Sequence, residues 1–153
     1  MATAQQPPDL NIPHSDATVE VSIIDTTSHL SLPSLMLVEP ELPGFNTITA
    51  CCYGFLIKHR STSPQDQNKY DNLIFDLGSR KDWENGPASI VEQVTPFKSA
   101  LHVEKDVATI LRENGQDLKD IGGIVWSHWH FDHTGNPATF PSSTDLIVGP
   151  GFK

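Results

Sequence analysis

Three histidines and one aspartate lie within six consecutive positions of the sequence, inside the segment SHWHFDHTGN at residues 127–136. Imidazole and carboxylate groups are borderline ligands that suit zinc. The remaining histidines stand singly and are expected to be solvated or locally hydrogen-bonded. The clustered residues His128, His130, Asp132 and His133 are therefore predicted to bind metal.

The spacing of these four residues suggests how they could converge. In an extended chain alternate side chains share one side, so His128, His130 and Asp132 can point the same way. Only His133 requires the chain to turn, and the Thr-Gly pair at residues 134–135 can provide that turn.

The cluster directly follows a segment with the pattern of a buried strand, GIVWS at residues 123–127. Active-site residues commonly lie at such a strand end. In the extended arrangement the residues between the ligands, Trp129 and Phe131, are expected to point into the packing.

Other strands and helices are needed to position this site. β-branched and apolar runs predict further strands at residues 18–25, 50–58, 72–78 and 145–148. A helix is predicted over residues 103–114, because apolar side chains recur there on one face and Gly115 can end it. Residues 87–94 predict one or two helical turns, while three prolines within residues 28–47 favour a loop-like path.

The composition indicates one folded, mixed α/β domain. The sequence has 153 residues, of which 37% are hydrophobic, with 12 prolines and 10 glycines, as in a loop-rich globular protein. Residues 1–17 are rich in Pro, Gln, Asp and Asn and predict a flexible leader, so the domain is expected to cover residues 18–153. The adjacent Cys51 and Cys52 are expected to be small buried side chains.

The net charge of −9 restricts the partners of the protein. It arises from 19 acidic and 10 basic residues and should repel nucleic acids and anionic membrane surfaces. No apolar run approaches the roughly 20 residues that span a bilayer, and the N-terminus lacks the pattern of a secretory signal. A cytoplasmic protein without nucleic-acid or membrane partners is expected.

The pattern H-x-H-x-D-H at the end of a buried strand resembles the metallo-β-lactamase superfamily, and HWHFDHTGN is similar to its lactonase branch, which includes homoserine lactonases. The upstream NLIFDLG also resembles that family. The resemblance implies an αββα sandwich of two similar halves, of which this chain would form roughly the first. It also implies that Asp76 braces the metal loop through hydrogen bonds, although an ordinary turn aspartate would fit the same position.

The same resemblance implies a reaction. His128 and His130 would bind one zinc ion and Asp132 and His133 a second, about 3.5–4 Å away. A zinc-bound hydroxide, oriented by Asp132, would attack the carbonyl of a small lactone or lactam, in xenobiotic detoxification or secondary metabolism. A thioesterase of the same fold is an alternative, and iron or manganese could replace zinc.

The family also needs ligands that this sequence does not supply. They are a third histidine for the first zinc, a bridging aspartate and a final histidine, yet only Asp145 and no histidine follow His133. An alternative is therefore a truncated, catalytically inactive relative. A half sandwich would leave a sheet face and an edge uncovered, which favours a homo-oligomer or pairing with a full-length paralogue that lends ligands.

Overall fold

The structure is a computed structural model that describes residues 11, 13–15, 17–60, 65 and 67–152. The strands are β1 (Val19–Pro33), β2 (Thr47–His59), β3 (Asn72–Phe75), β4 (Leu101–Val103), β5 (Gly123–Val125) and β6 (Asp145–Ile147). The α-helices are α1 (Ala88–Val94), α2 (Val107–Glu113) and α3 (Phe131–Thr134). The predicted leader lies largely outside the described residues, so the division of the chain at residue 17 stays a prediction.

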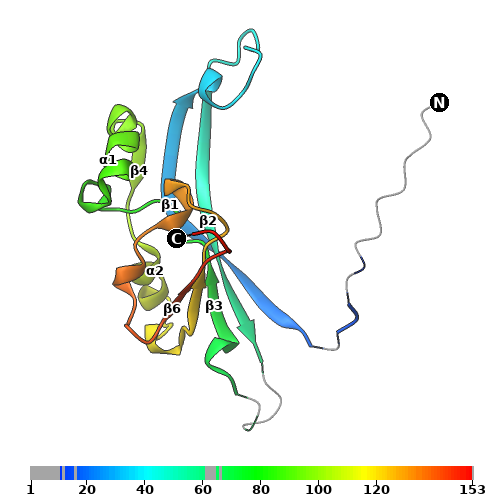
Figure 1. Cartoon of the computed structure of the whole chain (residues 1–153). Coiled ribbons are helices and arrows are strands. Elements are labelled where there is room, and N and C mark those ends of the chain that lie inside the picture. The colour runs from blue at the N-terminus through cyan, green and yellow to red at the C-terminus, as the bar shows by residue number, and fades with distance from the viewer. Residues whose placement is uncertain (1–10, 12, 16, 61–64, 66, 153) are drawn as a thin grey trace, which may run out of the picture.

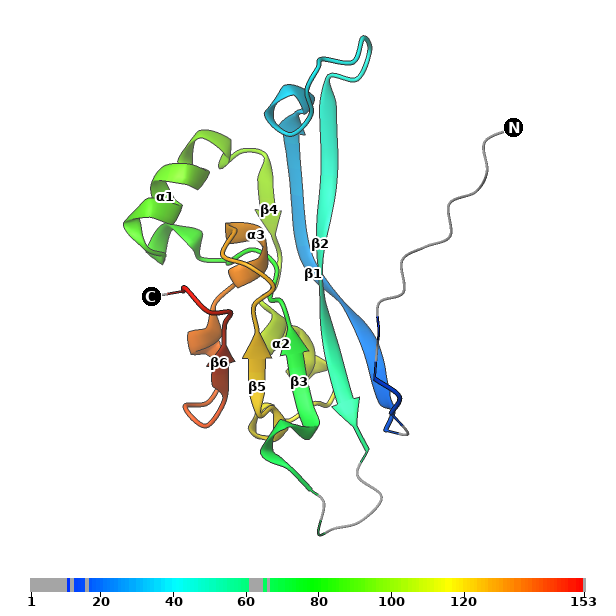
Figure 2. The same cartoon turned by 45° about the vertical axis from the view of Figure 1, so that its right-hand side comes forward.

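The strands form one mixed sheet in the order β4-β1-β2-β3-β5-β6. β1 and β2 form a long antiparallel hairpin whose far end projects beyond the rest of the molecule (Figure 1). β3 pairs antiparallel with β2, whereas β5 runs parallel to β3 and β6 runs parallel to β5. The expected mixed α/β fold is confirmed, and the carboxyl ends of β3 and β5 meet at one edge, next to α3 (Figure 2).

Most predicted elements are present, with two corrections. The prediction of a loop-like path from residue 28 is wrong for residues 28–33, which continue β1. No proline interrupts the backbone before Pro33, and this part of β1 pairs with β2 on one side and β4 on the other. The predicted helix starts too early, because Val103 ends β4 and the Asp106 carboxylate caps α2 by accepting a hydrogen bond from the backbone N–H of Thr109 at 2.8 Å.

The core lies between α2 and one face of the sheet. Ile24, Leu56 and Ile74 of the strands are buried in the same cluster as Val107 and Leu111 of α2. These side chains are drawn from four separate parts of the chain. The buried face of α2 therefore holds the strands that lead to the candidate site.

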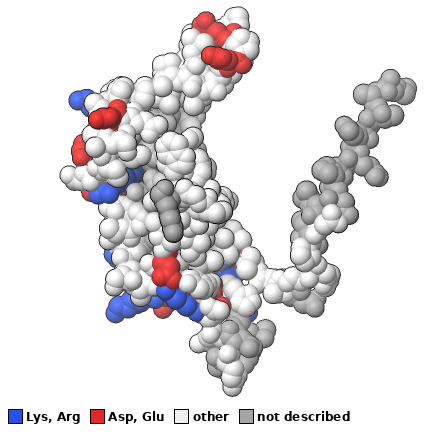
Figure 3. All heavy atoms as spheres, in the orientation of Figure 1, with Lys and Arg blue, Asp and Glu red and all other residues white. Residues whose placement is uncertain are grey.

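The opposite face of the hairpin carries exposed apolar side chains. Val19, Val21 and Ile23 of β1 are 55%, 54% and 70% exposed. The face seen in Figure 3 is largely uncharged in its middle, with acidic side chains gathered at the tip of the hairpin, where Glu39 and Glu41 are exposed.

Within the described residues no helix is long and apolar enough to cross a membrane.

Candidate metal centre and adjoining pocket

The metal loop, residues 127–134, is joined to the end of β3 through its backbone. The N–H of Leu77 donates to the carbonyl of His133 at 2.8 Å, and just before the loop the N–H of Asp76 donates to the carbonyl of Val125 in β5 at 3.0 Å. Gly135 has a φ of +47°, and a Cβ at this position would collide with Leu77. The glycine thus lets the loop turn back directly onto β3, as its place after the histidines predicted.

Asp76 connects the loop to the sheet through its side chain. The residue is only 4% exposed, and its Oδ1 accepts from the backbone N–H of Ser127 at 2.8 Å. Its Oδ2 accepts from Ser127 Oγ at 2.7 Å and lies 2.8 Å from Nδ1 of His133. Asp76 also has a φ of +60°, which is uncommon for a residue with a Cβ, and these contacts hold it there.

These hydrogen bonds indicate which ring nitrogen of His133 carries the proton when the imidazole is neutral. Because an ionised carboxylate only accepts, Nδ1 of His133 donates to Asp76, and in the neutral imidazole Nε2 then carries no proton. Nε2 lies 3.4 Å from Oδ2 of Asp132. Two donors that each stand about 2.0–2.2 Å from a tetrahedral ion are about 3.3–3.6 Å apart, so this spacing fits one shared metal.

The first histidine is oriented by the same network. Ser127 Oγ gives its proton to Asp76 and lies 2.9 Å from Nδ1 of His128, from which it accepts. The ring of His128 is centred 4.1 Å from that of His133 and 4.6 Å from that of His130. The predicted residues are therefore gathered at one place, and in the neutral ring of His128 the nitrogen without a proton is Nε2.

A metal fits these residues as pairs. Within the described part of the chain, no group of three His, Cys, Asp or Glu side chains is close enough to hold an ion. Asp132 and His133 have the spacing of two ligands of one metal, and His128 and His130 are adjacent rings. Imidazole nitrogens and a carboxylate oxygen are donors that suit zinc. These residues do not form a complete set of ligands for either ion.

The backbone of the loop differs from the expected extended chain. α3 begins at Phe131, and the N–H of His133 donates to the carbonyl of His130 at 3.0 Å. Asp132 and His133 therefore lie on a helical turn. The prediction that Trp129 points into the packing is wrong, because the residue is 61% exposed. Trp129 lies after the end of β5 and before the start of α3.

Two residues near the cluster were not predicted from the sequence to lie at the site. Ser127 links Asp76 to His128, and its position immediately before the first histidine is the only sequence signal for that role. Cys52 of β2 is half-buried, and burial followed by the nearby Asp132 carboxylate raises its pKa to about 11, although the Ser79 hydroxyl acts to lower it. The expectation of two buried cysteines is wrong for Cys51, which is exposed.

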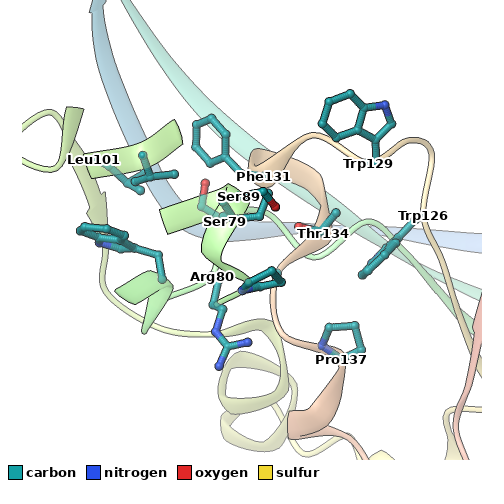
Figure 4. A pocket seen from close by; sticks show the side chains of 14 residues that line it. Ser79, Arg80, Ser89, Leu101, Trp126, Trp129, Phe131, Thr134 and Pro137 are labelled. Atoms are coloured by element: carbon teal, nitrogen blue, oxygen red, sulfur yellow. The ribbon is translucent and has the colours of Figure 1, made fainter. Parts of the chain in front are cut away.

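A pocket of about 300 Å³ adjoins the metal loop (Figure 4). Its walls come from the segment after β3, from α1 and from the metal loop itself. The side chains that define its character are Ser79, Arg80, Trp83, Trp126, Trp129 and Phe131. Four of these six are aromatic, so the pocket is mainly apolar.

Comparison with known proteins places the chain in a family. Residues 71–150 match the model of the metallo-beta-lactamase superfamily. The chain is 55% identical over 154 aligned positions to gamma-lactamase FDB1 of Fusarium pseudograminearum, covering 100% of this chain and 37% of that protein. It is 40% identical to metallo-hydrolase mfmC of Annulohypoxylon moriforme, covering 99% of this chain and 38% of that protein.

Among solved structures, a quorum-quenching N-acyl homoserine lactone lactonase has the same fold. The TM-score is 0.52 at 18% identity, with 82% of this chain and 43% of that chain covered. The chain thus spans well under half the length of the relatives it matches. Because the family model covers more than half of its 153 residues, the chain belongs to the metallo-β-lactamase superfamily.

Proposed function

We propose that this protein acts as a metal-dependent hydrolase that opens a small cyclic amide or ester, with zinc as the metal. The observation that carries the proposal is the 3.4 Å spacing of Asp132 and His133, with His133 oriented by buried Asp76. The name gamma-lactamase of the Fusarium relative favours a lactam over a lactone. The substrate of this chain remains part of the proposal.

In this proposal His128 and His130 hold one ion and Asp132 and His133 hold the other. A bound metal would supply Lewis acidity towards the carbonyl and would lower the pKa of a water molecule towards neutrality. The chain itself orients the ligands, because Asp76 and Ser127 hold the Nδ1 atoms and leave Nε2 of His128 and His133 to face the site.

Asp132 would have a second task. Its side chain is 31% exposed, so water can reach the carboxylate. An acceptor at this position can take a hydrogen bond from a water molecule and orient it towards the scissile carbonyl. Asp132 would then act on the substrate side of the loop, while Asp76 acts on its buried side.

A second candidate is a catalytically inactive relative, and one observation favours it. A catalytic zinc usually has three protein ligands, and the described residues do not bring three together. On this reading the loop would keep the family pattern without retaining metal. The two candidates make opposite predictions about metal binding.

Zinc stoichiometry distinguishes them. The purified chain is dialysed against zinc and its metal content is measured, alongside hydrolysis of γ-butyrolactam, γ-butyrolactone and a simple thioester. The hydrolase proposal requires retained zinc that is lost in His133→Ala but kept in the control His102→Ala, whose side chain is exposed on β4. Folded protein without zinc would instead support the inactive relative, and turnover of the thioester alone would support a thioesterase.

A further inference from the structure

The single glycine of β2 lies against the backbone of Asp76. Gly54 is buried and pairs with Ile24 of β1, so it stands in the interior of a strand. A Cβ at this position would lie 2.5 Å from the carbonyl oxygen of Asp76, whereas real Cβ atoms essentially never come closer than 3.0 Å. Glycine inside a strand often marks such a close approach of another backbone. The absence of a side chain at Gly54 therefore makes room for Asp76.

The peptide unit between Asp76 and Leu77 connects this contact to the metal loop. Its carbonyl oxygen faces Gly54, and its N–H donates to the carbonyl of His133 at 2.8 Å. A trans peptide unit is planar, and its C=O and N–H bonds point in opposite directions. The unit is thus a rigid link with β2 on one side and the metal loop on the other.

A methyl group at residue 54 would displace this peptide unit. β2 is paired with β1 on one side and β3 on the other, so the strand cannot easily move away. The Asp76 carbonyl oxygen would have to move by at least about 0.5 Å, from 2.5 to 3.0 Å. The same shift would lengthen the 2.8 Å contact of Asp76 Oδ2 with Nδ1 of His133 to about 3.3 Å, outside the usual range of about 2.7–3.2 Å.

β1 restricts the same segment from a second direction. Gly78 has a φ of +67°, and a Cβ there would collide with the side chain of Thr26. Thr26 is 1% exposed, and its hydroxyl donates to the carbonyl of Cys52 in β2 at 2.7 Å. The carbonyl of Gly78 in turn accepts from the N–H of Gly135 in the turn after the metal loop at 2.9 Å. The segment at residues 76–78 is therefore enclosed between the hairpin and the metal loop.

We propose that Gly54 is a positioning residue for the candidate metal centre. It lets β2 pass close to the peptide unit that follows Asp76, and it thereby keeps the Asp76 carboxylate within hydrogen-bonding distance of His133. The Asp76 carboxylate then holds the neutral imidazole of His133 in the form with the proton on Nδ1. The consequence for metal binding rests on the proposed function, whereas the effect on the imidazole does not.

The test measures which ring nitrogen of His133 carries the proton in the full 153-residue chain, freed of metal by a chelator. Long-range proton–nitrogen NMR correlations, recorded at a pH where the ring is neutral, distinguish the two forms, and His133→Gln identifies the signals. The natural chain should show the Nδ1–H form alone. Gly54→Ala should show both forms in exchange, because a neutral imidazole without a fixed acceptor can carry its proton on either nitrogen.

Gly115→Ala is the matched glycine control. Gly115 has a φ of +77°, but apart from its chain neighbours and the backbone of its own helix no atom in the described part of the chain lies within 4 Å of an added Cβ. Alanine is strained at that φ, so Gly115→Ala should lower stability and leave His133 in the Nδ1–H form. If Gly54→Ala does not fold in buffer, all three proteins are compared in sucrose, which favours the compact state.

Zinc affinity, measured by competition with a chelator, gives the second measurement. Gly54→Ala should bind zinc about tenfold more weakly than the natural chain, as when a group that orients a ligand is lost, and Gly115→Ala should bind it equally well.

Three results would overturn the inference. They are a mixture of the two ring forms in the natural chain, the Nδ1–H form alone in folded Gly54→Ala, and an equal change in Gly115→Ala, which would indicate a general loss of stability. A natural chain that retains no zinc would contradict the hydrolase proposal, while the ring measurement on metal-free protein would still decide the role of Gly54.

Discussion

Asp76 is the residue on which the local geometry of the metal loop depends most. One buried carboxylate accepts from a backbone N–H, a hydroxyl and an imidazole, and its own backbone has a φ of +60°. Removing it would leave these three donors without their acceptor. Stability and ligand orientation should therefore change together when this side chain is altered.

We expect Asp76→Ala to lower the free energy of unfolding by about 2–4 kcal/mol, because three hydrogen bonds to a charged group are lost. Asp76→Asn should cost less, since asparagine tolerates a positive φ and keeps one acceptor. Urea denaturation followed by circular dichroism measures both. Exposed Glu92→Ala is the control, and equal stability of Asp76→Ala and this control would contradict the role assigned to the carboxylate.

Ser127 offers a milder change at the same place. In Ser127→Ala the backbone N–H still bonds to Asp76, but the hydroxyl that lies between Asp76 and His128 is gone. Zinc affinity should fall about tenfold, as is typical when a group that orients a metal ligand is removed. Competition with a chromogenic chelator gives the affinity, Ser143→Ala provides an exposed serine for comparison, and an undiminished affinity would exclude this orienting role.

At the scale of the elements, the segment between β3 and α1 connects the sheet to the pocket. It contains the ion pair of Arg80 with Asp82, and hydrogen bonding to Arg80 holds the pKa of Asp82 below its usual 3.8. A carboxyl with a lowered pKa in the folded state binds protons more readily when unfolded. Its contribution is therefore present above pH 3.8 and is lost as the pH falls through the lower, folded pKa.

The stability of Asp82→Asn should depend on pH differently from the stability of the natural chain. The natural chain should lose the contribution of this pair on acidification below pH 3.8, whereas Asp82→Asn should lack that part of the decrease. The effect should be small, because the Asp82 side chain is 46% exposed and solvent screens the pair. Denaturation midpoints of the two proteins across this range provide the measurement, and parallel curves would refute the coupling.

Sequence patterns predicted which strands and helices lie near the site more accurately than they predicted where those elements begin and end. The strand before the metal loop and the glycine after it were evident, because burial and the turn impose residue types locally. The continuation of β1 to Pro33 was not evident, because pairing with both β2 and β4 stabilises it, and those partners are remote in sequence. The start of α2 depended on one cap at Asp106, which periodicity does not detect.

The candidate site could be predicted only in part for the same reason. The types and spacing of residues in the sequence predicted His128, His130, Asp132 and His133 as candidate ligands. The structure gathers these residues within one loop. The pocket could not be read from the sequence, since its walls are brought together from residues 79 to 137 by the fold. The exposure of Trp129 likewise follows from the start of α3 and has no local sequence signal.

At the scale of the whole molecule, apolar surface remains exposed at one sheet edge. In β6, Leu146 and Ile147 are 43% and 37% exposed, and β6 is the last strand in the order of the sheet. An accessible apolar edge strand favours pairing with another chain. The expectation of self-association or of pairing with a longer homologue is consistent with this surface and stays a proposal.

Sedimentation velocity at rising protein concentration should reveal association of the chain through this edge. Leu146→Lys should reduce it, because a charge on an edge strand opposes strand pairing. Glu92→Gln raises the net charge by the same single unit on α1 without changing the edge, and it controls for the net charge. A natural chain that stays monomeric throughout the concentration range would argue against the edge as an interface.

The shared location of Trp83, Trp126 and Trp129 has an optical consequence. Since the chain has only these three tryptophans, its intrinsic emission reports on one small region rather than on the sheet. Opening of the pocket would shift the emission spectrum even if the strands stayed paired. Loss of fluorescence signal and loss of the far-ultraviolet signal therefore need not coincide, and a gap between the two curves would mark a state in which the pocket has loosened around an intact scaffold.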